Sequence, residues 1–215
     1  EANPFLGWRA IRFCLQRPDI FMPQLRAILR AGCDGGTPLN VKIMLPMVGT
    51  LAELREAKSM LDEAKQQLRQ AGVAFNERME IGIMIEVPSA VAIADQLARE
   101  VDFFSIGTND LTQYVMAADR GNARVSGLAS ALQPAVLRNV RDAAEAAHAA
   151  GIWIGMCGEL VLLGLGLDEL SMSAPAIPTV KEAVRGLTME EARRIAGEAL
   201  ACESIEAVLN LLKNR

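Results

Sequence analysis

Two carboxylates and two arginines stand out in this sequence as side chains that could do chemistry. Glu86 closes an apolar run that begins at Ile81, and Asp110 follows the end of a second apolar run. If both runs are parallel strands, the two carboxylates share one rim of a sheet, where hard oxygen ligands without histidine suit Mg²⁺ bound jointly with a substrate phosphate. Arg9 and Arg120 are the candidate phosphate-binding residues, because a guanidinium offers fixed bidentate donors.

Each of these residues also has a simpler interpretation. Asp110 or Thr108 could cap a helix that follows the strand, since short polar side chains accept hydrogen bonds from free N–H groups at that position. Most arginines are solvated surface residues, and Arg12, one helical turn beyond Arg9, is the alternative if the register differs. Glu86 is harder to explain in this way, because a carboxylate that closes a buried strand needs a partner.

Among the four cysteines, Cys157 is the best placed for chemistry. It ends the apolar run 152–156 and precedes a glycine. A thiol has a pKa nearer neutrality than a hydroxyl, so it can exchange a proton with an enolate carbon, although a free cysteine is often only a packing group. The single histidine, His148, lies within an alanine-rich helical segment and is expected to be a surface residue.

The elements that must position these side chains alternate between strand and helix. Capping-box pairs, Thr50 with Glu53 and Thr188 with Glu191, predict the start of two helices. The glycine-rich stretch 32–38 is expected to be a loop. Short apolar runs predict strands at 41–47, 81–86, 101–106, 152–156 and 170–173, and helices are expected at 7–15, from residue 18, at 50–71, 89–99 and 134–150, and in the tail.

The expected strands are apolar on both faces, which is typical of a parallel sheet covered by helices. This pattern predicts an α/β fold with five strands. On pattern alone, the strands could form part of a TIM-type barrel or an open doubly wound sheet.

Composition limits the classes of partner. The chain has 215 residues, of which 51% are hydrophobic, so it suits one domain with a sizeable core. Its net charge of −4 and lack of a basic stripe argue against nucleic acid as a partner. No apolar run is long enough to span a bilayer, and no signal peptide is visible. The cysteines lack metal-ligand spacing and are expected to be reduced thiols in a cytoplasmic protein.

Five blocks of sequence, in order, carry a family resemblance. They are NPFLGWRAIR, KIMLPM, GIMIEVPSA, SIGTNDLTQY followed by DRGN, and GMCGEL followed by LDELSMSAPAIP. The chain resembles the phosphoenolpyruvate-binding barrel of enzyme I, the phosphoenolpyruvate–protein phosphotransferase family of the bacterial sugar phosphotransferase system. The barrels of pyruvate phosphate dikinase and phosphoenolpyruvate synthase are the nearest alternatives. A non-catalytic ligand-binding or dimerisation module is a third possibility.

The resemblance implies a TIM-type (β/α)8 barrel of the phosphoenolpyruvate/pyruvate kind, present here as about its last five strands. Residues 1–215 then correspond to an incomplete C-terminal phosphoenolpyruvate-binding barrel domain. The first strands and the phosphohistidine domain of the family are absent from this sequence, so the fragment alone is not expected to be active.

The resemblance also implies roles for five residues around the substrate. Glu86 and Asp110 correspond to ligands of Mg²⁺. Arg9, Asn109, Asp110 and Arg120 correspond to residues that bind the substrate, phosphoenolpyruvate. The phosphoryl group is expected to pass to a histidine on the separate phosphohistidine domain and then to the phosphocarrier protein HPr, with release of pyruvate, during sugar uptake.

In the same family, the cysteine that corresponds to Cys157 is the acid or base at the methylene carbon of the substrate. The family further implies a cytoplasmic homodimer. One departure lies after the Gly158-Glu159-Leu160 that follows this cysteine. Where the family has a short Ala-Gly-Asp segment, Val161 follows Glu159 and Leu160 here.

Overall fold

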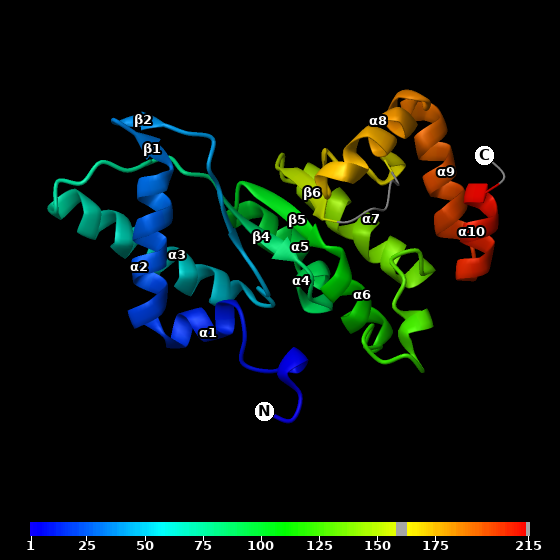
Figure 1. The fold of residues 1–215 in the computed structure, drawn as a ribbon, viewed down its shortest axis with the longest axis horizontal. Coiled ribbons are helices and arrows are strands. Elements are labelled where there is room, and N and C mark those ends of the chain that lie inside the picture. The colour runs from blue at the N-terminus through cyan, green and yellow to red at the C-terminus, as the bar shows by residue number, and fades with distance from the viewer. Residues whose placement is uncertain (158–162, 214–215) are drawn as a thin grey trace.

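A single parallel sheet organises the protein (Figure 1). The computed structural model describes residues 1–157 and 163–213, with Cys157 described by its backbone alone. Each strand of the sheet pairs with the next strand along the chain. The strands, in their order across the sheet, are β3 (Ile43–Leu45), β4 (Ile81–Ile85), β5 (Phe103–Gly107), β6 (Trp153–Cys157) and β7 (Glu169–Ser171).

The order of the strands distinguishes the two folds that the sequence left open. In a doubly wound sheet the strand order reverses at a switch point, whereas the strands of a TIM-type barrel follow one another in sequence around the cylinder. Here the order runs in one direction from β3 to β7, and all four pairings are parallel. The doubly wound alternative is therefore wrong, and the expected α/β fold, a partial barrel, is confirmed.

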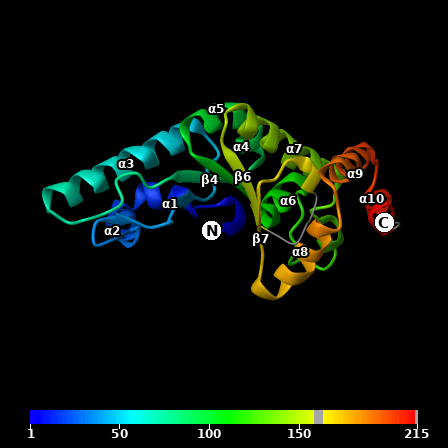
Figure 2. The ribbon, with the colours of Figure 1, turned by 90° about the horizontal axis from the view of Figure 1, so that it is seen from above.

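Helices connect the strands on one side of the sheet. In Figure 2 the helices α3, α5 and α7 form an arch over the strands, and α5 contacts both of the other two. This arrangement is that of repeated βα units. The connecting elements are α3 (Leu51–Gln70), α4 (Pro88–Ala92), α5 (Ala94–Leu97), η2 (Ala98–Glu100), α6 (Thr108–Met116), η3 (Ser126–Leu128), α7 (Pro134–Ala149) and η4 (Leu163–Leu165).

Further elements precede β3 and follow β7. Before the sheet the chain forms η1 (Pro4–Leu6), α1 (Ile11–Gln16), α2 (Pro18–Ala31) and a hairpin of β1 (Cys33–Asp34) and β2 (Thr37–Pro38). After it come η5 (Ala174–Ala176), α8 (Ile177–Arg185), α9 (Met189–Ala201) and α10 (Ile205–Lys213).

The two predicted capping boxes are both present in the structure. They form at Thr50 with Glu53 and at Thr188 with Glu191.

Two segments differ from the prediction. The stretch 32–38 is not a plain loop but a short antiparallel hairpin, which turns at two glycines with positive φ. The helix expected at 89–99 is broken, because Ile93 has φ −118° and separates α4 from α5.

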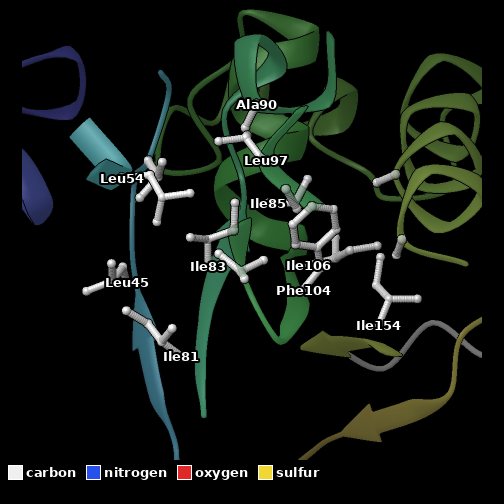
Figure 3. Packing of buried hydrophobic residues seen from close by; sticks show 14 of the residues in the cluster. Leu45, Leu54, Ile81, Ile83, Ile85, Ala90, Leu97, Phe104, Ile106 and Ile154 are labelled. Carbon is white, nitrogen blue, oxygen red and sulfur yellow. The ribbon is translucent and has the colours of Figure 1, made fainter. Parts of the chain in front are cut away.

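The core lies between the sheet and its helices. Alternate residues of the central strands, including Ile83, Ile85 and Phe104, are fully buried there with Leu54 and Leu97 of the helices (Figure 3). Burial of each such side chain stabilises the fold by about 1.5–3 kcal/mol. Because side chains alternate across a strand, Glu86, which follows β4, belongs to the opposite face of the sheet from Ile83 and Ile85.

That opposite face carries an aromatic pair. The rings of Phe103 and Trp153 stack with their centroids 4.5 Å apart, and Lys42 lies 5.6 Å from the Trp153 ring. His148 is exposed, as expected, with its Nε2 atom 3.0 Å from Oδ2 of Asp168. None of the helices in the described ranges is long and apolar enough to cross a membrane.

Candidate functional site

Glu86 lies directly after β4, and only 4% of it is exposed. Its Oε1 atom accepts a hydrogen bond of 2.7 Å from the backbone N–H of Met47, which follows β3. Met47 has φ +61°, a backbone conformation that non-glycine residues rarely adopt. This turn directs an N–H group at a buried carboxylate, so the ends of two neighbouring strands are joined at Glu86.

The close approach of β5 depends on a glycine. A Cβ atom at Gly107 would lie 2.7 Å from Oε2 of Glu86 and 2.8 Å from Sδ of Met84. No side chain can occupy this position without displacing Glu86. Gly107 therefore brings the end of β5 next to the Glu86 carboxyl group.

Asp110 lies in the first turn of α6, which begins immediately after Gly107. Neither Asp110 nor Thr108 caps the helix, because the N-cap is Gly107 and no side chain accepts a capping hydrogen bond there. The capping alternative is therefore wrong for both residues. Asp110 instead accepts a hydrogen bond of 3.1 Å from Nη2 of Arg9.

The electrostatics of the site are dominated by the buried carboxyl group. Burial raises the pKa of Glu86 to about 7, although the Met47 N–H bond acts in the opposite direction. The negative charge of Asp110 also contributes to the raised pKa, and the positive charge of Arg9 opposes it. Glu86, Asp110 and Arg9 are thus brought together by the structure, as two carboxyl groups with one guanidinium.

The N-terminal segment positions Arg9 against α6. The ring of Phe5 stacks on Tyr114 with centroids 4.4 Å apart, and the guanidinium of Arg9 lies 5.2 Å from the centre of the Phe5 ring. The Tyr114 hydroxyl donates a hydrogen bond to the Phe5 carbonyl. Arg9 is only partly covered, with 38% of its side chain exposed, so its guanidinium remains accessible to a ligand.

A cavity lies beside this segment. It has a volume of about 680 Å³, and its lining includes Phe5, Trp8, Arg9 and Asp119. The lining of a second cavity, of about 310 Å³, includes Phe5, Tyr114 and the end of α6. A small anionic ligand in the larger cavity can reach Arg9.

Two other predicted substrate-binding residues are exposed near these elements. Asn109 lies in the first turn of α6. Arg120 lies in the turn after α6, where its backbone N–H donates to Oε1 of Gln113. Within the described ranges, no salt bridge involves the Arg120 guanidinium. The structure therefore does not join Arg120 to the Glu86–Asp110–Arg9 group.

Arg12, the alternative to Arg9, has a different environment. Its Nε atom lies 3.6 Å from Oε1 of Glu53, the residue that completes the capping box of α3. Oε2 of the same Glu53 accepts hydrogen bonds from the N–H groups of Gly49 and Thr50. Arg12 therefore supports the turn between β3 and α3, whereas Arg9 faces Asp110.

The backbone of Cys157 ends β6 and pairs with Gly107 of β5 on one side and Ser171 of β7 on the other. Gly107 is also the residue that approaches Glu86, so the end of β6 lies on the same rim of the sheet. The Cys157 side chain and the Glu159–Leu160–Val161 junction lie outside the described part of the chain.

The sequence analysis missed Tyr114 and Phe5. A signal for Tyr114 was available, because it lies four residues after Asp110 in a helix and so shares its face. No local pattern could identify Phe5, since its contact with Tyr114 spans 109 residues of chain.

Within the described ranges, no group of three or more His, Cys, Asp or Glu residues could hold a metal ion. A metal at Glu86 and Asp110 must therefore take further ligands from elsewhere.

Comparison with known proteins finds relatives that are similar along nearly the whole chain. The chain is 49% identical over 221 residues to the phosphoenolpyruvate-protein phosphotransferase of Staphylococcus carnosus, covering 99% of this chain and 38% of that protein. It is 50% identical over 221 residues to the protein of the same name from Bacillus subtilis, with the same coverage. The chain thus spans well under half the length of these curated relatives.

A solved structure supports the fold alone. A citrate lyase from Burkholderia xenovorans superimposes with a TM-score of 0.56 at 17% sequence identity, over 90% of this chain and 67% of that one. Residues 1–189 match the family described as "PEP-utilising enzyme, PEP-binding domain". Since this match covers most of the sequence, the chain belongs to the PEP-binding domain family of PEP-utilising enzymes.

Proposed function

We propose that this chain is the phosphoenolpyruvate-binding part of a phosphoenolpyruvate–protein phosphotransferase that acts in bacterial sugar uptake. One observation carries the proposal: Glu86, Asp110 and Arg9 meet at the carboxyl ends of β4 and β5. In barrels of this type the carboxyl ends of the strands carry the chemistry. The curated relatives bear the name of this activity.

The two carboxyl groups fit a Mg²⁺ site that is shared with the substrate. Glu86 is buried beside Asp110, and a divalent cation there offsets both the burial and the repulsion that raise the Glu86 pKa. Mg²⁺ in proteins usually has one or two carboxylates and completes its octahedron with water and substrate oxygens. When bound, Mg²⁺ neutralises negative charge on the phosphate and carboxylate oxygens of phosphoenolpyruvate.

The side chains of this protein then have separate tasks. Arg9 donates to the phosphate from its place beside Asp110, and Arg120 and Asn109 supply further donors from exposed positions near the rim. The phosphoryl group leaves the enol oxygen for a histidine nitrogen on a separate domain. From there it passes to the phosphocarrier protein HPr.

Cys157 completes the reaction by protonating carbon. Loss of the phosphoryl group leaves the enolate of pyruvate, and the Cys157 thiol transfers its proton to the methylene carbon to give pyruvate and a thiolate. Solvent returns a proton to the thiolate before the next turnover. The backbone position of Cys157, beside Gly107 on the rim, supports this role.

The binding step can be tested by calorimetric titration of the full-length protein with phosphoenolpyruvate, with and without Mg²⁺. We expect affinity to depend on Mg²⁺ and to fall at least ~10-fold, about 1.4 kcal/mol, in Glu86→Gln and in Asp110→Asn. Glu77→Gln is the matched control, because Glu77 is an exposed carboxylate paired with Arg69. Binding that ignores Mg²⁺ and survives both substitutions would contradict the proposal.

The role of Cys157 has its own test. Cys157→Ala in the full-length protein should bind phosphoenolpyruvate with nearly normal affinity, while turnover falls by roughly 10²–10⁴, the contribution of a positioned acid or base. Cys202→Ala should stay within a few-fold of the wild type. A folded Cys157→Ala protein with wild-type turnover would exclude the role.

The proposed protein is a cytoplasmic homodimer that associates through this barrel. This part of the proposal rests on the resemblance of the chain to enzyme I. Analytical ultracentrifugation of the full-length protein at tens of micromolar should give a dimer. A monomer with and without ligand would contradict this part of the proposal.

A further inference from the structure

Tyr114 joins α6 to the N-terminal segment. Its hydroxyl donates to the carbonyl of Phe5, and its ring stacks on the Phe5 ring with an interplanar angle of 21°. The same hydroxyl oxygen lies 3.9 Å from Sδ of Met47, the residue whose N–H binds Glu86. Burial raises the pKa of Tyr114, so the hydroxyl keeps its proton and acts as a donor near neutral pH.

The contacts continue from Phe5 to Arg9 and return to α6. The Arg9 guanidinium lies 5.2 Å from the Phe5 ring centre and donates to Asp110 over 3.1 Å. Asp110 and Tyr114 are one helical turn apart in α6, so they lie on the same face. Tyr114, Phe5, Arg9 and Asp110 therefore form a closed ring of contacts.

Arg9 needs such support, because the local backbone does not fix it. Residue 9 lies between η1 and α1, outside any helix or strand, and Ala10 follows with φ +52°. An arginine has many rotamers, and ordering it on ligand binding costs free energy unless its position is set beforehand. The stacked pair holds the segment that carries Arg9 against the helix that carries Asp110.

We propose that Tyr114 is a positioning residue that, through Phe5, holds the Arg9 guanidinium at the rim beside Asp110, ready to receive the substrate phosphate. This inference rests on the proposed function. Tyr114 contributes no reacting group of its own. Its effect on the ligand passes through Arg9, which separates it from a residue that only packs the core.

Two substitutions divide the contributions of Tyr114. Tyr114→Phe keeps the stacked ring and removes the hydroxyl, with its bond to the Phe5 carbonyl and its contact with Sδ of Met47. In the full-length protein with Mg²⁺, we expect it to weaken phosphoenolpyruvate binding roughly fivefold, the size of one hydrogen bond. Tyr114→Leu also removes the stacking and should weaken binding more. Inhibition by pyruvate, which has no phosphate, should change less than about twofold in Tyr114→Phe.

A double-mutant cycle with Arg9→Ala tests whether Tyr114 acts through Arg9. Once the guanidinium is gone, adding Tyr114→Phe should weaken phosphoenolpyruvate binding by less than about twofold, because coupled residues are not additive. The same fivefold loss in both backgrounds would overturn the proposal. So would unchanged affinity in both Tyr114→Phe and Tyr114→Leu.

Matched aromatic substitutions guard against a general loss of folding. Phe5→Leu should weaken phosphoenolpyruvate binding. Phe75→Leu should not, although Phe75 also has an arginine, Arg69, at 5.8 Å from its ring. Equal losses in both variants would overturn the proposal. If Arg9→Ala alone leaves phosphoenolpyruvate affinity unchanged, the role of Arg9 in the proposed function is wrong. If Arg9→Ala weakens binding but Tyr114→Phe does not, only the positioning role of Tyr114 is wrong.

Discussion

At the scale of single residues, Glu86 couples the site to the stability of the protein. Its pKa is raised from an ordinary 4.5 to about 7, by burial first and then by Asp110. The folded protein therefore holds this proton up to a higher pH than the unfolded chain does. The contribution of Glu86 to stability is fully present below about pH 4.5 and is lost as the pH rises through about 7.

Glu86→Gln should remove this pH dependence. A glutamine carbonyl can still accept the hydrogen bond of the Met47 N–H, while the buried charge is gone. Relative to the wild type, the variant's free energy of unfolding should increase between pH 5 and pH 8 by roughly 3 kcal/mol at most, following 1.36 kcal/mol per pKa unit. Urea denaturation without Mg²⁺ measures it.

The control for this prediction is Glu77→Gln. The Arg69 hydrogen bond lowers the pKa of Glu77, so removing that carboxylate cannot stabilise the protein as the pH rises. A stability difference between Glu86→Gln and the wild type that stays constant from pH 5 to pH 8 would show that Glu86 titrates normally in the folded state.

At the scale of elements, α3 and α9 both begin with a capping box. Thr50 and Thr188 both accept a hydrogen bond of 3.2 Å from the N–H of a glutamate three residues later. The Thr50 box ends the turn that contains Met47, whereas the Thr188 box lies between α8 and α9. Thr50→Ala and Thr188→Ala should each lower the free energy of unfolding by about 1 kcal/mol.

Only Thr50→Ala should also change the affinity for phosphoenolpyruvate. Relaxing the turn at Thr50 loosens Met47, so Thr50→Ala should weaken phosphoenolpyruvate binding measurably while Thr188→Ala leaves it unchanged. Thermal unfolding and calorimetric titration on the same two variants provide the comparison. Equal ligand affinity in both would show that the Met47 turn does not depend on the cap.

The elements that could be predicted from sequence are those that local residue types decide. Capping boxes and short apolar runs located α3, α9 and the five strands, because each signal is contained within a few neighbouring residues. The break at Ile93 carries no comparable signal. The partner of Asp110 could not be predicted either, since Arg9 lies 101 residues away and the local pattern allowed a helix cap equally well.

The candidate site was partly predictable for the same reason. Strand ends pointed to Glu86 and Asp110, and the structure brings these two together with Arg9. It leaves Arg120 exposed in a turn, without an ion pair in the described ranges, and it supplies Tyr114 and Phe5 instead. Contacts between the N-terminal segment and α6 depend on the tertiary fold, which periodicity does not encode.

At the scale of the whole molecule, the sheet should not be equally stable across its width. All five residues of β5 are buried and the strand pairs on both sides, whereas β7 has three residues and pairs with β6. Hydrogen exchange of the 1–215 chain should therefore be at least ~100-fold slower for β5 amides than for those of β7. Equal protection would indicate that a further strand, from another copy, covers β7.

The strand order also bears on how this protein is made. The amino end of the chain leaves the ribosome first, and each of the inner strands β4, β5 and β6 pairs with the strands directly before and after it. Every new βα unit of the sheet therefore meets an edge that was synthesised just before it, so these strand pairings need no segment that is made later. Growth by addition exposes one new strand edge at a time, which limits the surface from which aggregation begins.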